Sequence, residues 1–214
     1  MLDSEVLEEI NSTYMENEKL PEIMKDLNHD VNITYWAGKF CTEQYYENTD
    51  LAEILFEYAV NKCETWRDYK ELAFAVGNSN GFDDKEWARE LMDKATQKVE
   101  ILRDLRSLAD AIATKNLSFY DRGYATELYK EALEKSTIAY EFYCIAESLC
   151  NKDMLDDKDW AMDVYQKAVE CAADSDELTY IADSIADEDN LADEQWAEEL
   201  YKIAEEFEGT KELD

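Results

Sequence analysis

The sequence contains few of the residues that make turns. Its 214 residues include only five glycines and one proline, Pro21, which leaves little turn chemistry for a multi-stranded sheet. No window approaches about 18 consecutive apolar residues, so we expect no membrane-spanning segment. The first residues lack the basic and apolar regions of a secretory signal peptide. These absences, together with an apolar content of 46%, favour a folded, all-α protein.

Cysteine is not arranged in a pattern typical of disulfides or metal sites. The five cysteines are an odd number, contain no Cys-x-x-Cys spacing and do not recur with the repeat described below. Free cysteine is among the most buried residue types, and thiols of the cytosol stay reduced. We therefore predict reduced core thiols and a cytoplasmic location. The residues are Cys41, Cys63, Cys144, Cys150 and Cys171.

Residues that carry catalysis are also scarce. A general base is most often histidine, and the one histidine, His29, lies in a polar stretch where we expect an exposed loop. A cysteine–histidine pair stays open geometrically, but no local motif supports it. The sequence contains no glycine-rich phosphate loop, no Walker A sequence and no Gly-x-Ser-x-Gly motif. We therefore predict a protein that is not an enzyme and has no catalytic residue and no cofactor.

The acidic stretch 187–190 is the one segment that suggests a calcium site. A calcium loop of the EF-hand type needs a ligand at its fifth position and glycine at its sixth. Leu191 and Ala192 occupy those positions, so the motif fails. Weak, non-specific binding of divalent cations stays open, and we predict no metal site.

The sequence does contain a five-fold internal repeat of about 36 residues. Its copies start 36, 37, 36 and 36 positions apart. Each copy places apolar residues at positions i, i+1, i+4, i+5 and i+8, which lie on one face of a helix. A period in this range predicts one supersecondary unit stacked on itself. The copies begin at Leu51, Trp87, Tyr124, Trp160 and Trp196.

A second apolar stripe follows the first in each of the first four copies. Its Leu-Ala or Ile-Ala pair lies 21 residues after the start of the copy, at Leu72, Leu108, Ile145 and Ile181. An Asn or Asp stands three residues before each start, where it is expected to cap the helix and favour its dipole. These predicted caps are Asn48, Asp84, Asp121, Asp157 and Asp193.

Caps and stripes together predict an all-α, single-domain α-solenoid of about five to six antiparallel helix pairs. The tryptophans that recur with the repeat, Trp87, Trp160 and Trp196, are expected to pack in the core or between repeats. A repeat array needs atypical ends to cover its core. The predicted segments are a degenerate N-terminal capping repeat (1–47), repeats 48–83, 84–120, 121–156 and 157–192, and a C-terminal capping helix (193–214).

These residues resemble a known group of repeats. The Ala-x-x-x-Tyr-x-x-Ala spacing resembles the second helix of tetratricopeptide repeats, and Ala-x-x-Leu-Tyr-Lys-x-Ala at 125–132 and 197–204 is similar to Sel1-like repeats. Leu-Ala and Ile-Ala stand where those families usually have Leu-Gly, and the proline at the repeat end is missing. The resemblance covers about residues 14–207. It implies a helix-pair solenoid that binds other proteins along a concave surface, as an adaptor or regulator.

Acidic residues greatly outnumber basic ones, and their distribution is uneven. The 53 Asp and Glu residues against 21 Lys and Arg residues give a formal charge of −32. Residues 1–84 carry −13, residues 85–135 carry no net charge, and residues 136–214 carry −19. Proteins bind nucleic-acid backbones and acidic membranes through Lys and Arg side chains. We therefore expect no direct binding to nucleic acid and none to membranes.

Two interpretations of this acidity stay open. The first is a well-hydrated surface that only keeps the protein soluble. The second is that carboxylates on successive helices occupy a basic surface on another protein. Our leading prediction is a non-enzymatic protein–protein interaction module, an adaptor or regulator, with a basic partner. The alternative is an acidic nucleic-acid mimic that inhibits a DNA- or RNA-binding protein by occupying its basic groove.

Two groups of residues are candidates for contact with that partner. Trp66 replaces Leu102, Ala139 and Ser175 at equivalent positions, so we expect it to face the surface. The remaining candidates are acidic residues of the last full pair, on a helix that in the resembled families tends to line the concave face. They are Asp174, Asp176, Glu177, Asp183, Asp187, Glu188 and Asp189.

Overall fold

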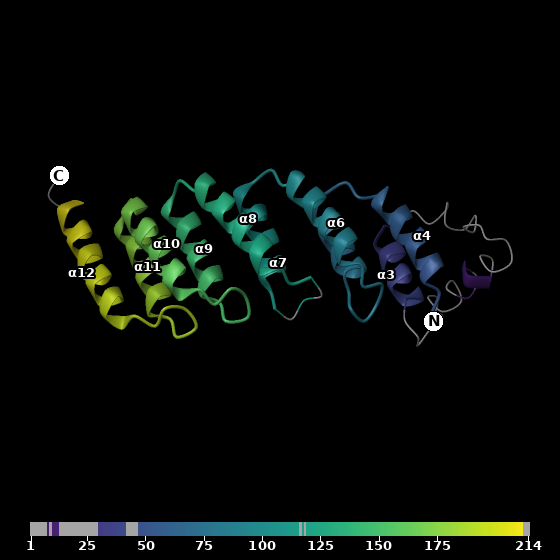
Figure 1. Cartoon of the computed structure of the whole chain (residues 1–214). Coiled ribbons are helices and arrows are strands. Elements are labelled where there is room, and N and C mark those ends of the chain that lie inside the picture. The colour runs from purple at the N-terminus through teal and green to yellow at the C-terminus, as the bar shows by residue number, and fades with distance from the viewer. Residues whose placement is uncertain are drawn as a thin grey trace. The chain divides into compact units, whose positions relative to one another are not determined.

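The computed structural model describes residues 8, 10–12, 30–41, 47–115, 117 and 119–211, and these residues contain helices and no strand. The predicted all-α class is thereby confirmed for the described part of the chain (Figure 1). None of the described helices is long and apolar enough to cross a membrane. The labelled helices are α3 (Asp30–Phe40), α4 (Thr49–Val60), α5 (Trp66–Val76), α6 (Lys85–Gln97), α7 (Leu102–Ala113), α8 (Arg122–Lys135), α9 (Ala139–Cys150), α10 (Lys158–Cys171), α11 (Ser175–Ala186) and α12 (Glu194–Lys211).

The chain divides into two compact units, Met1–Val99 (unit 1) and Glu100–Asp214 (unit 2), each considered by itself. In unit 1, α3 packs against α4 and α5 packs against α6. In unit 2, the packed pairs are α7 with α8, α9 with α10 and α11 with α12. Each pair therefore joins a second-stripe helix to the capped helix that follows it. The predicted segments 48–83, 84–120, 121–156 and 157–192 begin between the two helices of a pair, and the single solenoid domain over 1–214 stays a prediction.

The five predicted caps are confirmed. In each case the side-chain oxygen of the Asn or Asp accepts a hydrogen bond from the backbone N–H three residues later, at 2.9–3.2 Å. Such a bond satisfies one of the backbone donors that a helix start leaves without a partner. The donors belong to Leu51, Trp87, Tyr124, Trp160 and Trp196, the residues that open the repeats.

The loop inside each pair follows a common design. The backbone N–H of each cap donates to a carbonyl near the end of the preceding helix, as Asp84 does to Val76 at 3.0 Å and Asp157 to Leu149 at 2.8 Å. In four of the five loops the residue before the cap has a positive φ, at Glu47, Asp83, Asp156 and Ala192. The fifth loop is one residue longer, since Asp121 donates to Ile112. This conformation turns the chain back on itself so that the two helices of a pair can pack.

The two predicted stripes form the core. Leu72, Leu108, Ile145 and Ile181 are buried together with the alanine that follows each of them. Trp87 contacts Phe56 edge to face at 6.2 Å between ring centroids, and Trp160 contacts Tyr129 at 6.4 Å. Each contact joins the capped helices of two successive copies, which confirms the packing predicted for Trp87 and Trp160. Trp196 is half-buried.

Two expectations about exposure are wrong. Trp66 is only 6% exposed, because it opens α5 with its ring covered by neighbouring cations: the Arg67 guanidinium lies 4.5 Å and the Lys70 amine 5.7 Å from the ring centroid. It is a packing residue rather than a surface contact. Among the cysteines, Cys144 and Cys150 are buried, whereas Cys171 is exposed at the end of α10. His29 and Pro21 lie outside the described residues.

Candidate functional site

The acidic candidates of the last full pair lie on α11 and on the two loops beside it. Asp174 is the N-cap of α11 and accepts from the Glu177 backbone N–H at 2.9 Å. The Glu177 side chain in turn accepts from the backbone N–H of Ala173 at 2.8 Å. These two carboxylates therefore stabilise the start of α11 by accepting hydrogen bonds from the backbone N–H groups around it. Asp176 and Glu188 are exposed.

Asp187 also has a structural role, which the sequence did not suggest. Its carboxylate accepts from the backbone N–H of Asp189 at 2.8 Å. Asn151 makes the same bond to Asp153, and Asn78 makes it to Asn80. The three residues stand at equivalent places in three loops, so an Asx turn is part of the repeat. Asp189 additionally pairs with Lys152 of the neighbouring loop at 3.2 Å.

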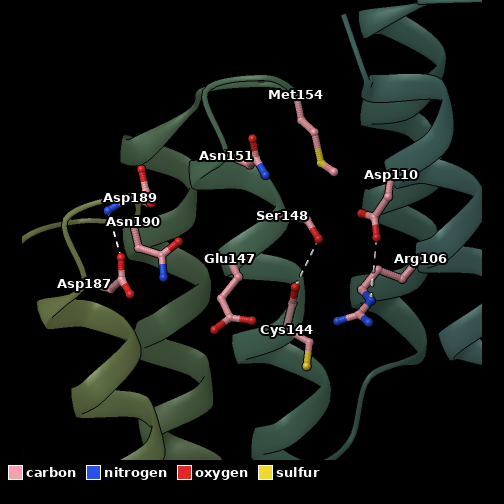
Figure 2. A pocket seen from close by; sticks show the side chains of 10 residues that line it. All are labelled: Arg106, Asp110, Cys144, Glu147, Ser148, Asn151, Met154, Asp187, Asp189 and Asn190. Atoms are coloured by element: carbon pink, nitrogen blue, oxygen red, sulfur yellow. Dashed lines mark hydrogen bonds and ion pairs between the residues drawn. The ribbon is translucent and has the colours of Figure 1, made fainter. Parts of the chain in front are cut away.

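A groove opens in unit 2 between α7, α9 and the loops that follow α9 and α11. It has a volume of about 390 Å³. Figure 2 shows Arg106 and Asp110 on one side, the residues of α9 in the middle, and the loop residues after α11 on the other side. The groove thus brings two of the predicted residues, Asp187 and Asp189, together with Glu147 of α9. Its lining residues are Arg106, Asp110, Cys144, Glu147, Ser148, Asn151, Met154, Asp187, Asp189 and Asn190.

Two of the groove carboxylates, Asp110 and Glu147, occupy the same position of the repeat as Asp183 of α11. Asp110, Glu147 and Asp183 each follow the Leu-Ala or Ile-Ala pair of their helix directly, and the same position in unit 1 holds Phe74. This register was readable in the sequence, but Asp110 and Glu147 were not predicted. An acidic residue beside a buried pair stands out only when the copies are aligned, because acidic residues are abundant throughout the chain.

Two of these carboxylates accept a hydrogen bond from a tyrosine hydroxyl of a capped helix. Tyr129 donates to Asp110 Oδ1 at 2.7 Å, and Tyr201 donates to Asp183 Oδ1 at 2.6 Å. Glu147 is linked through a second residue: Ser184 donates to Glu147 Oε1 at 2.8 Å, and the Ser184 hydroxyl lies 2.7 Å from that of Tyr165.

Burial perturbs the groups at the α7 end of the groove. It raises the pKa of Asp110 above the ordinary aspartate value, although hydroxyl groups of Tyr129 and Ser148 and the charge of Arg106 act in the opposite direction. The pKa of Tyr129 is raised well above that of a free tyrosine, first by burial and then by the charge of Asp110. Arg106 Nε is 4.0 Å from Asp110 Oδ2, too far for a hydrogen bond, and this buried nitrogen has no hydrogen-bond partner among the described residues.

Equivalent positions on the three second-stripe helices of unit 2 hold different kinds of side chain. Equivalent positions hold Arg103 on α7, Tyr140 on α9 and Asp176 on α11. One turn further on, Ser107, Cys144 and Tyr180 are equivalent. Tyr140, one turn before Cys144 of the groove, is 53% exposed, and Tyr180 is 62% exposed. The surface therefore runs from basic to aromatic to acidic, and the two exposed tyrosines were not predicted as contact residues.

No described group of three or more His, Cys, Asp or Glu side chains is placed to hold a metal ion. Comparison with protein-family models, with curated proteins and with solved structures finds no match to this chain. The function must therefore be argued from the groove and from the charge around it.

Proposed function

We propose that this chain is a non-enzymatic protein-binding module, a helix-pair repeat protein of the tetratricopeptide-like or Sel1-like kind that works in the cytoplasm. Its partner is a protein with a basic surface, and the contact is made by α9, α11 and the loop after α11. The observation that carries the proposal is the gathering of Glu147, Asp187 and Asp189 in one groove, in the part of the chain with a net charge of −19.

Long-range attraction is the physical basis of such a contact. An excess of carboxylates on one surface raises the rate at which a basic protein associates with it. Exposed charges are screened beyond about 10 Å at 0.1 M salt, so the association should weaken as salt is added. If the charge only keeps the protein soluble, neutralising carboxylates on this surface should affect association no more than neutralising them elsewhere.

The test uses a basic protein captured from native lysate, with association rates measured over a salt series. The variant carries Asp176→Asn, Glu177→Gln, Asp183→Asn and Glu188→Gln, which remove charge but keep acceptor oxygens for Ala173 and Tyr201. We expect association to slow by about tenfold or more. The matched control neutralises exposed carboxylates on α8, α10 and α12, namely Glu134, Asp163, Glu170 and Glu198.

Equal slowing by both variants, or binding that ignores salt, would refute a specific role for this surface. Adding duplex DNA or RNA as a competitor addresses the nucleic-acid mimic. A partner that releases its nucleic acid when this chain binds would favour the mimic over the plain adaptor.

A further inference from the structure

The groove of unit 2 has the size and the walls of a site for one long side chain. A water molecule accounts for about 30 Å³ of liquid. The groove volume of about 390 Å³ therefore holds a long side chain with water beside it. It is open to solvent, so a segment passing over the surface can reach its lining residues on α9 and on the loop 187–190.

Its charges favour a cation. Arg106 faces Asp110 at 4.0 Å, and Lys152 pairs with Asp189 at 3.2 Å, so these two cations are each matched by a carboxylate. Glu147 and Asp187 remain, and no ion pair to either is found among the described residues. Glu147 Oε1 accepts from Ser184 at 2.8 Å, which orients the carboxylate where it lines the groove. A carboxylate oriented by a neutral donor retains its full charge for an incoming cation.

Two exposed tyrosines, on α9 and α11, favour arginine over lysine as the side chain that the groove binds. Tyr140 lies one turn before Cys144, which lines the groove, and Tyr180 lies one turn before Ser184, the residue that contacts Glu147. Both rings are more than half exposed. A guanidinium group stacks on such rings and binds carboxylates in a bidentate manner, whereas an ammonium group is a strongly hydrated point charge.

We infer that the groove binds an arginine side chain from an extended basic segment of the partner protein. Glu147 contacts the guanidinium, Asp187 adds attraction, and Tyr140 and Tyr180 flank the segment. The inference rests on the proposed function, because it specifies where on the acidic surface the basic partner is held. Glu147 is absent from the four-residue variant described above, so the two ideas are tested by different substitutions.

The probe is a fluorescent Gly-Ser peptide with spaced arginines, and its control is the same peptide with citrulline, a neutral analogue of arginine. We expect the arginine peptide to bind and the citrulline peptide not to bind. Glu147→Gln should weaken binding by about tenfold, since one charge-assisted contact is lost. It keeps an acceptor for Ser184. Glu134→Gln on α8 makes the same change at an exposed site and should alter affinity less than about twofold.

Two further measurements locate the peptide. Tyr180→Ala should weaken binding by about threefold, whereas Tyr180→Phe keeps the ring face and should bind like the parent. With methyl-labelled methionine, the NMR signal of Met154 in the groove should shift on titration. Met162, which is exposed on α10, should not shift.

The inference is overturned if Glu147→Gln and Glu134→Gln weaken binding equally, or if the Met154 signal does not move. In both cases the peptide still binds, so the acidic surface keeps its proposed function without a specific groove. Failure of the arginine peptide to bind better than the citrulline peptide also overturns the inference. If salt and the four-residue variant then leave the captured partner unaffected, the proposed function fails as well. Thermal unfolding of each variant checks that the fold is retained.

Discussion

Units 1 and 2 place different side chains at the same two positions of the repeat. The large position of the capped helix holds Phe56 and Met92 in unit 1, but Tyr129, Tyr165 and Tyr201 in unit 2. The position after the buried Leu-Ala pair holds Phe74 in unit 1 and a carboxylate in each copy of unit 2. Both changes occur together, and a hydroxyl gained on one helix meets an acceptor gained on the other.

The consequence is an apolar interior at these positions in unit 1 and a polar one in unit 2. In unit 1, Phe56, Phe82 and Trp87 form an edge-to-face cluster with centroid distances of 5.4–6.2 Å. In unit 2 the position after the buried pair holds a carboxylate in each copy, and two of these, Asp110 and Glu147, line the groove. The repeat therefore keeps the same helix pairs while these positions are apolar in unit 1 and polar in unit 2, where we propose a binding surface.

The largest effect is expected from the aromatic cluster of unit 1. Phe56 is fully buried, so Phe56→Ala removes a ring that contacts two others and should cost about 3–5 kcal/mol of unfolding free energy. Urea unfolding followed by tryptophan fluorescence measures this. Tyr35→Ala, at an exposed aromatic residue of the same unit, is the control and should cost less than about 1 kcal/mol. A similar loss for both would contradict the assignment of Phe56 to the core.

A smaller loss is expected from removing one hydroxyl in unit 2. Tyr129→Phe removes the hydroxyl that donates to the partly buried Asp110 and should cost about 1–3 kcal/mol. Tyr201→Phe removes the equivalent bond to Asp183 at an exposed site and should cost less than about 1 kcal/mol. Chemical unfolding of the two variants side by side provides the measurement. If Tyr129→Phe were neutral, the hydroxyl–carboxylate bond would not contribute to the stability of unit 2.

Features that depend on neighbours in sequence were predictable. An Asn or Asp three residues before a helical stripe caps that helix through a bond that spans three residues, so spacing alone located Asn48, Asp84, Asp121, Asp157 and Asp193. The buried stripes followed from helical periodicity in the same way. Which helices form a pair could not be predicted, because spacing does not show whether a helix packs more closely against the helix before it or the helix after it.

The roles of individual side chains were missed, because periodicity locates the buried face of a helix but not the contacts that one side chain makes. Trp66 was expected at the surface because its counterparts are smaller, but Arg67 and Lys70 cover its ring. Asp174 and Asp187 were predicted to contact a partner, and both first serve a cap or a turn. Glu147 was overlooked, since its importance comes from Ser184 on another helix. In a chain with 53 acidic residues, only their surroundings separate structural carboxylates from those available to a ligand.

Opposite dependences on pH should distinguish one aspartate in each unit. Burial raises the pKa of Asp110, so its contribution to stability is present below the ordinary aspartate pKa of about 3.9 and is lost as pH rises through the raised value. For Asp68, burial acts to raise the pKa, but hydrogen bonds from Thr65 and Glu64 lower it overall. Its contribution is present above the ordinary value and is lost as pH falls through the lowered one.

The measurement is the unfolding free energy of the parent minus that of Asp110→Asn or Asp68→Asn, across the acidic range. The Asp110 difference should decrease with rising pH, and the Asp68 difference should increase. Parallel curves would mean that the two carboxylates experience similar surroundings, and would contradict the contrast between the units.

The smallest effect is expected at the starts of α5 and α9, where the units differ again at one repeat position. Thr65 caps α5 in a capping box with Asp68, whereas Ile138 begins α9 without a side-chain cap and is 50% exposed. Glu141, three residues later, already accepts from the Thr137 backbone N–H at 2.8 Å. Ile138→Thr would complete a Thr-x-x-Glu capping box and should stabilise α9 by about 1 kcal/mol.

The reciprocal change, Thr65→Ile, should cost about the same amount in unit 1, and Ile138→Val, which adds no cap, should be neutral. Thermal unfolding monitored by circular dichroism compares the three variants. If Ile138→Thr had the same unfolding temperature as the parent, a side-chain acceptor at the start of α9 would not stabilise the helix. A gain would mean that unit 2 retains an exposed isoleucine, two residues from Tyr140, at a cost in stability. Loss of the arginine peptide's affinity in the stabilised variant would then place Ile138 within the binding surface.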